Sequence, residues 1–158
     1  MRREYVATRL ATAAVAVVVA ACGSTPPVTT AGYLDQVAAI TVKMTNDSVA
    51  TLPQGKTPTH LLVAAIIGLR STALDEIENL EPTDETRPEH TALVTTLGSL
   101  VDAGNAFLDQ TAALDQAAFV EALTTSTDID ALADDVHAAC VAMERLATAL
   151  GHPVTMGC

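Results

Sequence analysis

Aromatic residues are scarce in this sequence, and tryptophan is absent. Two tyrosines and two phenylalanines make up 3% of the 158 residues. Because β-sandwiches depend on aromatic and β-branched side chains, this scarcity disfavours a sheet protein. It also argues against a stacking surface for sugars or for single-stranded nucleic acid. The hydrophobic residues, 49% of the chain, are mostly Ala, Leu and Val, which favours closely packed helices.

Basic residues are also few. The chain has 8 Lys and Arg against 19 Asp and Glu, and its formal net charge is −11. Such a chain repels polyanions, so we expect neither nucleic acid nor an anionic membrane surface among its partners. Cations and basic partners are compatible with this charge.

A long hydrophobic run is missing as well. The chain begins with a basic segment, residues 10–21 are then uncharged and mostly apolar, and Cys22 ends this stretch. A helix that crosses a bilayer needs about 20 such residues. A short apolar run behind positive charges is typical of a secretory signal, so we interpret residues 1–21 as a signal peptide.

The end of this run, Val19-Ala20-Ala21-Cys22, resembles the lipobox of bacterial lipoproteins. The resemblance implies a diacylglyceryl group on the Cys22 sulfur, cleavage between Ala21 and Cys22, and acylation, for example by palmitate, of the new amino group. Two or three acyl chains attach a protein durably, so the implied location is the outer face of the cell membrane. The Ala-, Thr- and Asp-rich, Lys-poor composition resembles that of actinobacteria, including mycobacteria. The alternative is an ordinary signal peptide that happens to contain a cysteine.

Composition divides the rest of the chain into two parts. Residues 22–30 combine the candidate lipid site with a short Pro- and Thr-rich stretch, which favours extended backbone and serves as a tether. Residues 31–158 carry the helical patterns and are predicted to form one domain.

Apolar spacing predicts the first three helices of this domain. One covers roughly Gly32 to Val49. The second follows Thr57 as its cap, with Pro58 at its first position. The third begins with a capping box formed by Thr86 and Glu89.

The third helix can break near Asp115, which would leave Gln116 to Leu123 as a short separate helix. A fourth long helix is predicted after Thr127 as its cap, and Gly151 stops it. We therefore expect an all-α, up-and-down antiparallel four-helix bundle.

The last long helix has the most regular pattern. Its apolar residues alternate at spacings of three and four, which forms a heptad seam. The seam consists of Ile129, Leu132, Val136, Ala139, Met143, Leu146 and Leu150. We expect Val136 and Met143 to be core residues and His137 to lie at the edge of the seam.

Two cysteines remain if Cys22 carries lipid. An even pair outside the cytosol favours a disulfide between Cys140 and Cys158. The extended tail after Gly151 is long enough to fold back and tie the C-terminus to the last helix. The alternative is two free thiols, one buried and one terminal.

Motifs for catalysis and for cofactors are missing. No two of the four histidines are spaced three or four residues apart, and there is no phosphate-binding glycine loop, nucleophile elbow or Cys-x-x-Cys pair. Asp130, Asp134 and His137 share one helical face, which makes them weak candidate metal ligands. Ser126 and His137 with an aspartate are a remote candidate for a hydrolytic triad. We therefore predict no catalytic residues and no cofactor.

These observations favour a non-catalytic, membrane-anchored helical module that binds a protein partner or a small apolar ligand at the cell envelope. A metal or haem carrier that uses His137 or another histidine is the alternative, and a hydrolase is a remote one.

Overall fold

Five helices packed together make up this domain, and the computed structural model describes residues 28–157. No described residue lies in a strand, so the all-α prediction is confirmed. The helices are α1 (Thr30–Thr51), α2 (His60–Glu78), α3 (Arg87–Thr111), α4 (Gln116–Thr124) and α5 (Thr127–Ala149).

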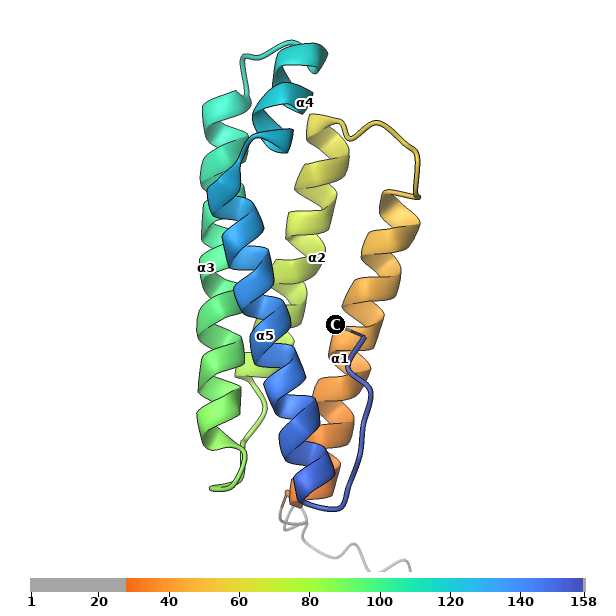
Figure 1. Cartoon of the computed structure of the whole chain (residues 1–158), viewed down its shortest axis with the longest axis vertical. Coiled ribbons are helices and arrows are strands. Elements are labelled where there is room, and N and C mark those ends of the chain that lie inside the picture. The colour runs from red at the N-terminus through yellow and green to blue at the C-terminus, as the bar shows by residue number, and fades with distance from the viewer. Residues whose placement is uncertain (1–27, 158) are drawn as a thin grey trace, which may run out of the picture.

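The four long helices lie side by side along the long axis of the molecule (Figure 1). The chain reverses its direction from each long helix to the next, and the short α4 lies at one end, between α3 and α5. α3 packs against both α2 and α5, while α1 packs against α2. The centre of the bundle is therefore organised around α3.

The sequence left open whether a short separate helix follows Asp115, and the structure shows that it does, as α4. It begins at Gln116, and Asp115 caps it by accepting a hydrogen bond from the Ala118 amide at 2.9 Å. Phe119 of α4 is 2% exposed and packs with Ile67, among others, in a small second core. This helix closes the end of the bundle at which α3 finishes.

The start of α2 differs from the prediction. The cap is Thr59 rather than Thr57, so Pro58 lies outside the helix. The Thr59 backbone is extended and its hydroxyl accepts a hydrogen bond from the Leu62 amide at 3.3 Å. The Pro58 carbonyl meanwhile accepts a hydrogen bond from the Gln116 side chain at 2.7 Å, which links this turn to α4.

The predicted capping box of α3 is wrong. Thr86 precedes the helix, but its backbone is helical and its side chain caps no amide. A turn from Thr83 comes first, and the buried Thr86 hydroxyl donates a hydrogen bond to the Thr83 carbonyl at 3.3 Å. Because the Thr86 backbone is helical instead of extended, its hydroxyl is not placed to accept a hydrogen bond from the first turn of α3.

The predicted cap of the last helix is also shifted by one residue. Thr127 is the first residue of α5, and Ser126 occupies the cap position without a side-chain hydrogen bond. Only Thr125 and Ser126 separate α4 from α5, and the Thr127 amide bonds to the Thr125 carbonyl at 3.0 Å. This tight turn leaves no extended residue for a capping side chain.

The main core joins α1, α2, α3, α5 and the C-terminal tail. It is composed of buried side chains that come from all five segments. They are Tyr33, Leu34, Val37, Ile77, Leu93, Leu97, Ala139, Cys140, Met143, Ala147 and Met156.

The heptad seam of α5 is fully buried only in its middle, at Ala139 and Met143. Met143 is 0% exposed, as predicted for a core residue. Val136 is only partly buried, and it lines a cavity in addition to touching the core. The prediction that Val136 is a core residue therefore holds only in part, because it packs against the main core but also borders open space. At the other end of the seam, Leu150 is 42% exposed.

The C-terminal tail folds back along α5, as the sequence predicted. Gly151, at φ 77°, ends the helix, and the His152 amide bonds to the Ala147 carbonyl at 2.9 Å. The returning residues then lie against α5 and α1 (Figure 1). The Met156 amide donates to the Glu144 carboxylate at 2.7 Å.

The last described residue of the tail is held by α1. The Thr45 hydroxyl donates a hydrogen bond to the Gly157 carbonyl at 2.8 Å. Gly157 has φ 64°, and a Cβ at this position would lie 3.2 Å from the Val42 Cα. Both the dihedral angle and the close approach require glycine here.

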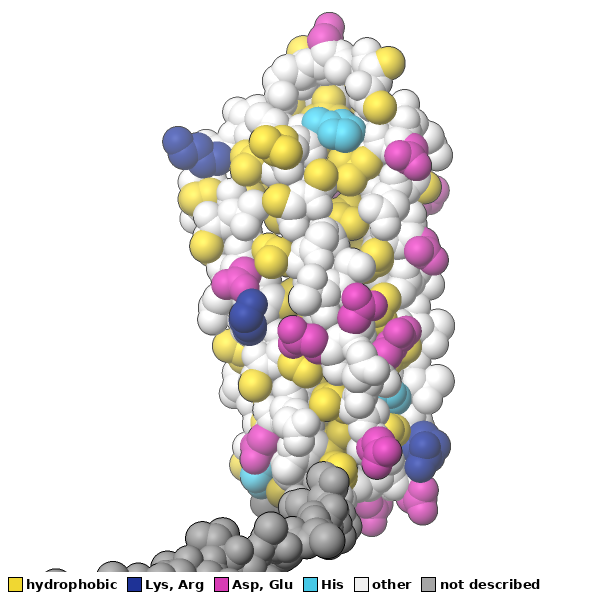
Figure 2. All heavy atoms as spheres, turned by 180° about the vertical axis from the view of Figure 1, so that it is seen from behind, with side chains coloured by type: hydrophobic (Ala, Val, Ile, Leu, Met, Phe, Trp, Pro, Cys, Tyr) yellow, Lys and Arg dark blue, Asp and Glu magenta, His cyan; other side chains and the backbone are white. Residues whose placement is uncertain are grey.

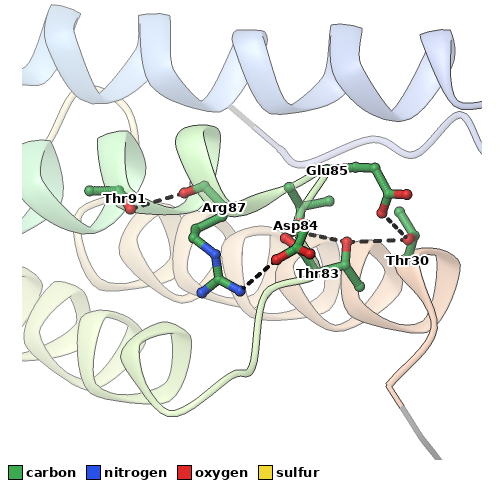
Figure 3. A network of polar contacts seen from close by, with 7 residues as sticks. Thr30, Thr83, Asp84, Glu85, Arg87 and Thr91 are labelled. Carbon is green, nitrogen blue, oxygen red and sulfur yellow. Dashed lines mark hydrogen bonds and ion pairs between the residues drawn. The ribbon is translucent and has the colours of Figure 1, made fainter.

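A polar network holds the start of α1 at the loop between α2 and α3 (Figure 3). The Thr30 hydroxyl lies 3.2 Å from the Thr83 hydroxyl and 3.1 Å from the Glu85 carboxylate. Thr29 caps α1 through the Gly32 amide at 3.0 Å. The sequence placed Thr29 and Thr30 in the tether, whereas the structure places both at the start of the first helix. The remainder of the tether and the signal segment, residues 1–27, lie outside the described residues.

We predict that the buried middle of the seam contributes most to the stability of α5. Met143→Ala should lower the free energy of unfolding by about 2–5 kcal/mol, because a fully buried side chain leaves a cavity. Leu150→Ala, at the exposed C-cap of the same helix, should cost under about 1 kcal/mol. Urea denaturation followed by circular dichroism measures both. Equal effects of the two variants would contradict the packing of α5 described above.

Candidate functional site

A cavity of about 170 Å³ lies between the long helices, where the first half of α5 borders open space. We call it the central cavity. The C-terminal tail and all four long helices contribute to its wall. The lining residues are Thr41, Met44, Thr45, Arg70, Leu97, Leu100, Ala133, Val136, His137, Cys140, Met156 and Gly157.

A second cavity, also of about 170 Å³, lies nearer to α4. We call it the apolar cavity, because its lining carries only one charged side chain, that of Arg70. The other lining residues are Leu52, Val63, Ile66, Ile67, Leu100, Gly104, Phe107, Leu123 and Ile129.

A glycine shapes the wall of the apolar cavity. A Cβ at Gly104 would clash with the Ile67 side chain, so α3 approaches α2 closely here only because this residue lacks a side chain. Ile67 is 7% exposed and packs into the space that the glycine leaves. The close contact closes one side of the cavity.

Arg70 and Leu100 line both cavities, so the two spaces adjoin at these residues. The Arg70 side chain comes from α2 and is partly buried. Burial lowers the pKa of its guanidinium, although an arginine still carries its charge at neutral pH. Among residues 28–157, no group forms a hydrogen bond or an ion pair with it.

This environment distinguishes Arg70 from the other basic residues of the described segment. Lys43, Lys56, Arg87 and Arg145 are all exposed. Two of them form surface ion pairs, Lys43 with an aspartate at 2.7 Å and Arg87 with another at 3.1 Å. Among the basic residues of the described segment, Arg70 is thus the one that is partly buried, and it has no counter-charge.

Sequence reasoning missed Arg70, although a signal was present. Ile66 and Arg70 are four residues apart, and Val63 and Arg70 are seven apart, so all three share one face of α2. This face carries the apolar stripe of the helix. An arginine that continues an apolar stripe is the sequence pattern that indicates an inward-facing charge such as Arg70.

One face of the molecule carries both acidic and hydrophobic side chains at its surface. Figure 2 shows hydrophobic side chains gathered toward the α4 end of one face and acidic side chains over its middle and lower parts. Leu61 and Val49 are the most exposed large hydrophobic residues, at 78% and 62%. Apolar surface is therefore available at the end of the bundle that also holds the apolar cavity.

The weak metal candidates do not form a site. Asp130, Asp134 and His137 are all exposed on α5. Within residues 28–157, no group of three or more His, Cys, Asp or Glu side chains is arranged to hold a metal ion. The predicted shared face exists, but it is an acidic face of the helix.

The remote triad is not assembled either. Ser126 precedes α5, whereas His137 lies in its middle. At 1.5 Å per residue the two backbones are about 16 Å apart along the helix axis. A serine and its base must be within hydrogen-bond reach, so this pair cannot act together.

The other histidines take part in contacts that hold the fold. His60 lies 3.0 Å from the Leu108 carbonyl, and its ring packs against Phe119. His152 pairs with Asp35 at 2.8 Å, near the end of α5.

Tyr33 and His90 form a polar pair between α1 and α3, with the Tyr33 hydroxyl 2.9 Å from the His90 Nδ1. Burial raises the pKa of the Tyr33 phenol. Burial, assisted by the nearby Arg87 charge, lowers the pKa of His90, so its neutral form is favoured. A neutral ring that accepts a hydrogen bond from the phenol suits a structural link between α1 and α3.

Cys140 is 5% exposed and lines the central cavity together with Met156 and Gly157. Its predicted disulfide partner, Cys158, lies outside the described residues, as does the candidate lipid site at Cys22.

Comparison of the chain with protein-family models, with curated proteins and with solved structures found no match. In the described part of the chain, no helix combines the length and the apolar character needed to span a bilayer.

Proposed function

We propose that this chain is an exported lipoprotein whose helical domain binds a small apolar ligand between its helices. The observation that carries the proposal is the pair of adjoining cavities, one of them lined almost entirely by aliphatic and aromatic side chains. Ligand sites of helical bundles lie between helices, and apolar walls with a few polar groups are typical of them.

The cavities favour a small ligand over a protein partner for this site. Side chains from several helices line both spaces, so a molecule bound in either would contact more than one helix of the bundle. The metal or haem carrier and the hydrolase lack a comparable supporting arrangement in residues 28–157.

The lipid anchor is part of the same proposal. Its support is the short apolar run that ends in Val19-Ala20-Ala21-Cys22, behind a basic start. α1 starts at the end of the bundle opposite α4, and α4 contributes to the wall of the apolar cavity, so an anchor before α1 would be attached at the other end from that cavity.

Cys22→Ala should release the protein from the membrane. Without the sulfur no thioether to lipid can form, and the described helices contain no span that would replace the anchor. Fractionation of cells that express the wild type or the variant measures this. A variant that stays as firmly bound to membranes as the wild type would contradict the lipoprotein proposal.

We also propose the finer form of the fold, an up-and-down antiparallel bundle whose tail is tied back by a disulfide between Cys140 and Cys158. Its support is the position of Gly157, the residue before Cys158, which lines the same cavity as Cys140. The hydrogen bonds of Met156 and Gly157 to α5 and α1 already bring the tail to this place. Closing a loop of this length stabilises a protein by about 2–4 kcal/mol.

Protein isolated without reductant should therefore have no thiol at either position. Alkylation in denaturant followed by mass spectrometry should find Cys140 and Cys158 in one linked pair of peptides, and both should be alkylated after reduction. Alkylation of both cysteines before reduction would rule out the bond.

The apolar cavity can be tested by filling it. Val63→Trp should abolish binding of dodecanol, a neutral alkyl probe, because the indole occupies the space that the alkyl chain needs. Leu61→Trp is the matched control, since Leu61 lies on the same helix but is 78% exposed. Isothermal titration calorimetry measures the binding.

The natural chain contains no tryptophan, so each variant carries a single reporter of its own environment. Emission should be blue-shifted for Val63→Trp and water-like for Leu61→Trp, which verifies where each ring lies. Unchanged dodecanol binding by a folded Val63→Trp variant with blue-shifted emission would refute the cavity as the ligand site.

A further inference from the structure

The positive charge of Arg70 has no counter-charge in the described fold. Arg70 is partly buried at the junction of the two cavities, and no group within residues 28–157 pairs with it. Burying a charge without a partner is costly, and arginine stems usually carry their heads out to water. A position that bears this cost without a gain in stability is a candidate for ligand recognition.

None of the residues that line the central cavity with Arg70 is an aspartate or a glutamate. Thr41 donates its hydroxyl to the carbonyl of Val37 at 3.0 Å, and Thr45 donates its hydroxyl to the carbonyl of Gly157 at 2.8 Å. Neither side chain carries a negative charge. Arg70 therefore brings a permanent positive charge to the central cavity, and no carboxylate among the lining residues balances it.

The two sides of Arg70 differ in chemistry. On one side lies the apolar cavity, with walls such as Ile66, Phe107 and Ile129. On the other side lies the central cavity, which is partly polar and contains Thr41 and Thr45. A ligand that fits both sides has an alkyl chain joined to a polar, negatively charged head.

We infer that the ligand is a single-chain amphiphile with a carboxylate head, whose head pairs with Arg70 while its alkyl chain occupies the apolar cavity. The planar guanidinium matches a carboxylate in two parallel hydrogen bonds. One arginine balances one negative charge, and the net charge of −11 disfavours ligands that carry many. This inference rests on the proposed function, because it names the ligand class for the same cavities.

The test compares three probes that share one chain length: dodecanoate, dodecanol and dodecyltrimethylammonium. Titration calorimetry on the full-length chain should show that dodecanoate binds about tenfold more tightly than dodecanol, as expected for one charge-assisted pair. The cationic probe should bind more weakly than dodecanol. Equal binding of the acid and the alcohol would overturn the inference.

Variants locate the preference. Arg70→Gln should bind the acid and the alcohol equally, and Arg70→Lys, which keeps the charge, should retain most of the preference for the acid. Arg145→Gln is the matched control, because Arg145 is exposed and lies outside both cavities. A folded Arg70→Gln variant that still prefers the acid tenfold would also overturn the inference.

Stability provides a readout that does not depend on any ligand. The midpoint of urea unfolding of Arg70→Gln, without ligand, should be unchanged or higher, because the variant loses a charge that has no partner. A clear fall of this midpoint would instead make Arg70 a structural residue and contradict its role in recognition.

Failure of this inference and failure of the proposed function give different results. Dodecanol that binds to the wild type and not to Val63→Trp supports the cavity whatever happens at Arg70. Absence of binding by both the acid and the alcohol removes the cavity as a ligand site, and the inference about its head group fails with it.

Discussion

The return of the C-terminal tail into the bundle is the contact on which the rest of the structure depends. α1 packs mainly against α2, while α5 packs mainly against α3, so the tail supplies much of what joins α1 to α5. Met156 is 0% exposed in the main core, and its neighbour Gly157 is bonded to α1. Met156 and Gly157 also line the central cavity, together with residues of all four long helices. The tail therefore joins α1 to α5 and forms part of the cavity wall.

The helices themselves could be predicted because their causes are local. The spacing of three and four along α5 and the glycine that ends it placed that helix nearly to the residue. Asp115 likewise marked the start of α4. The caps were harder to predict, because several threonines compete and neighbouring turns decide among them. Thr86 lost its expected role to a turn from Thr83, and a sequence pattern does not show such a turn.

The candidate site could not be predicted in the same way. Its most informative residue, Arg70, is significant because it lacks a partner, and a missing partner appears only when the neighbours of a side chain are known. The cavities result from long-range packing, including the clash-free approach of Gly104 to Ile67 and the position of the tail. The seam of α5 predicted Val136 as core, but whether a seam meets side chains or open space depends on the opposite helix.

The polar network at Thr30 determines which end of the bundle an N-terminal lipid anchor would hold. Its bonds to Thr83 and Glu85 hold the first turn of α1 at one end of the bundle, whereas α4 and the apolar cavity lie toward the other end. α1 has 22 residues and therefore spans about 33 Å. With a lipid anchor on the N-terminal side, the apolar cavity would lie toward the end of the bundle that is remote from the attachment point. A bound amphiphile would then be held away from the anchored end of the domain.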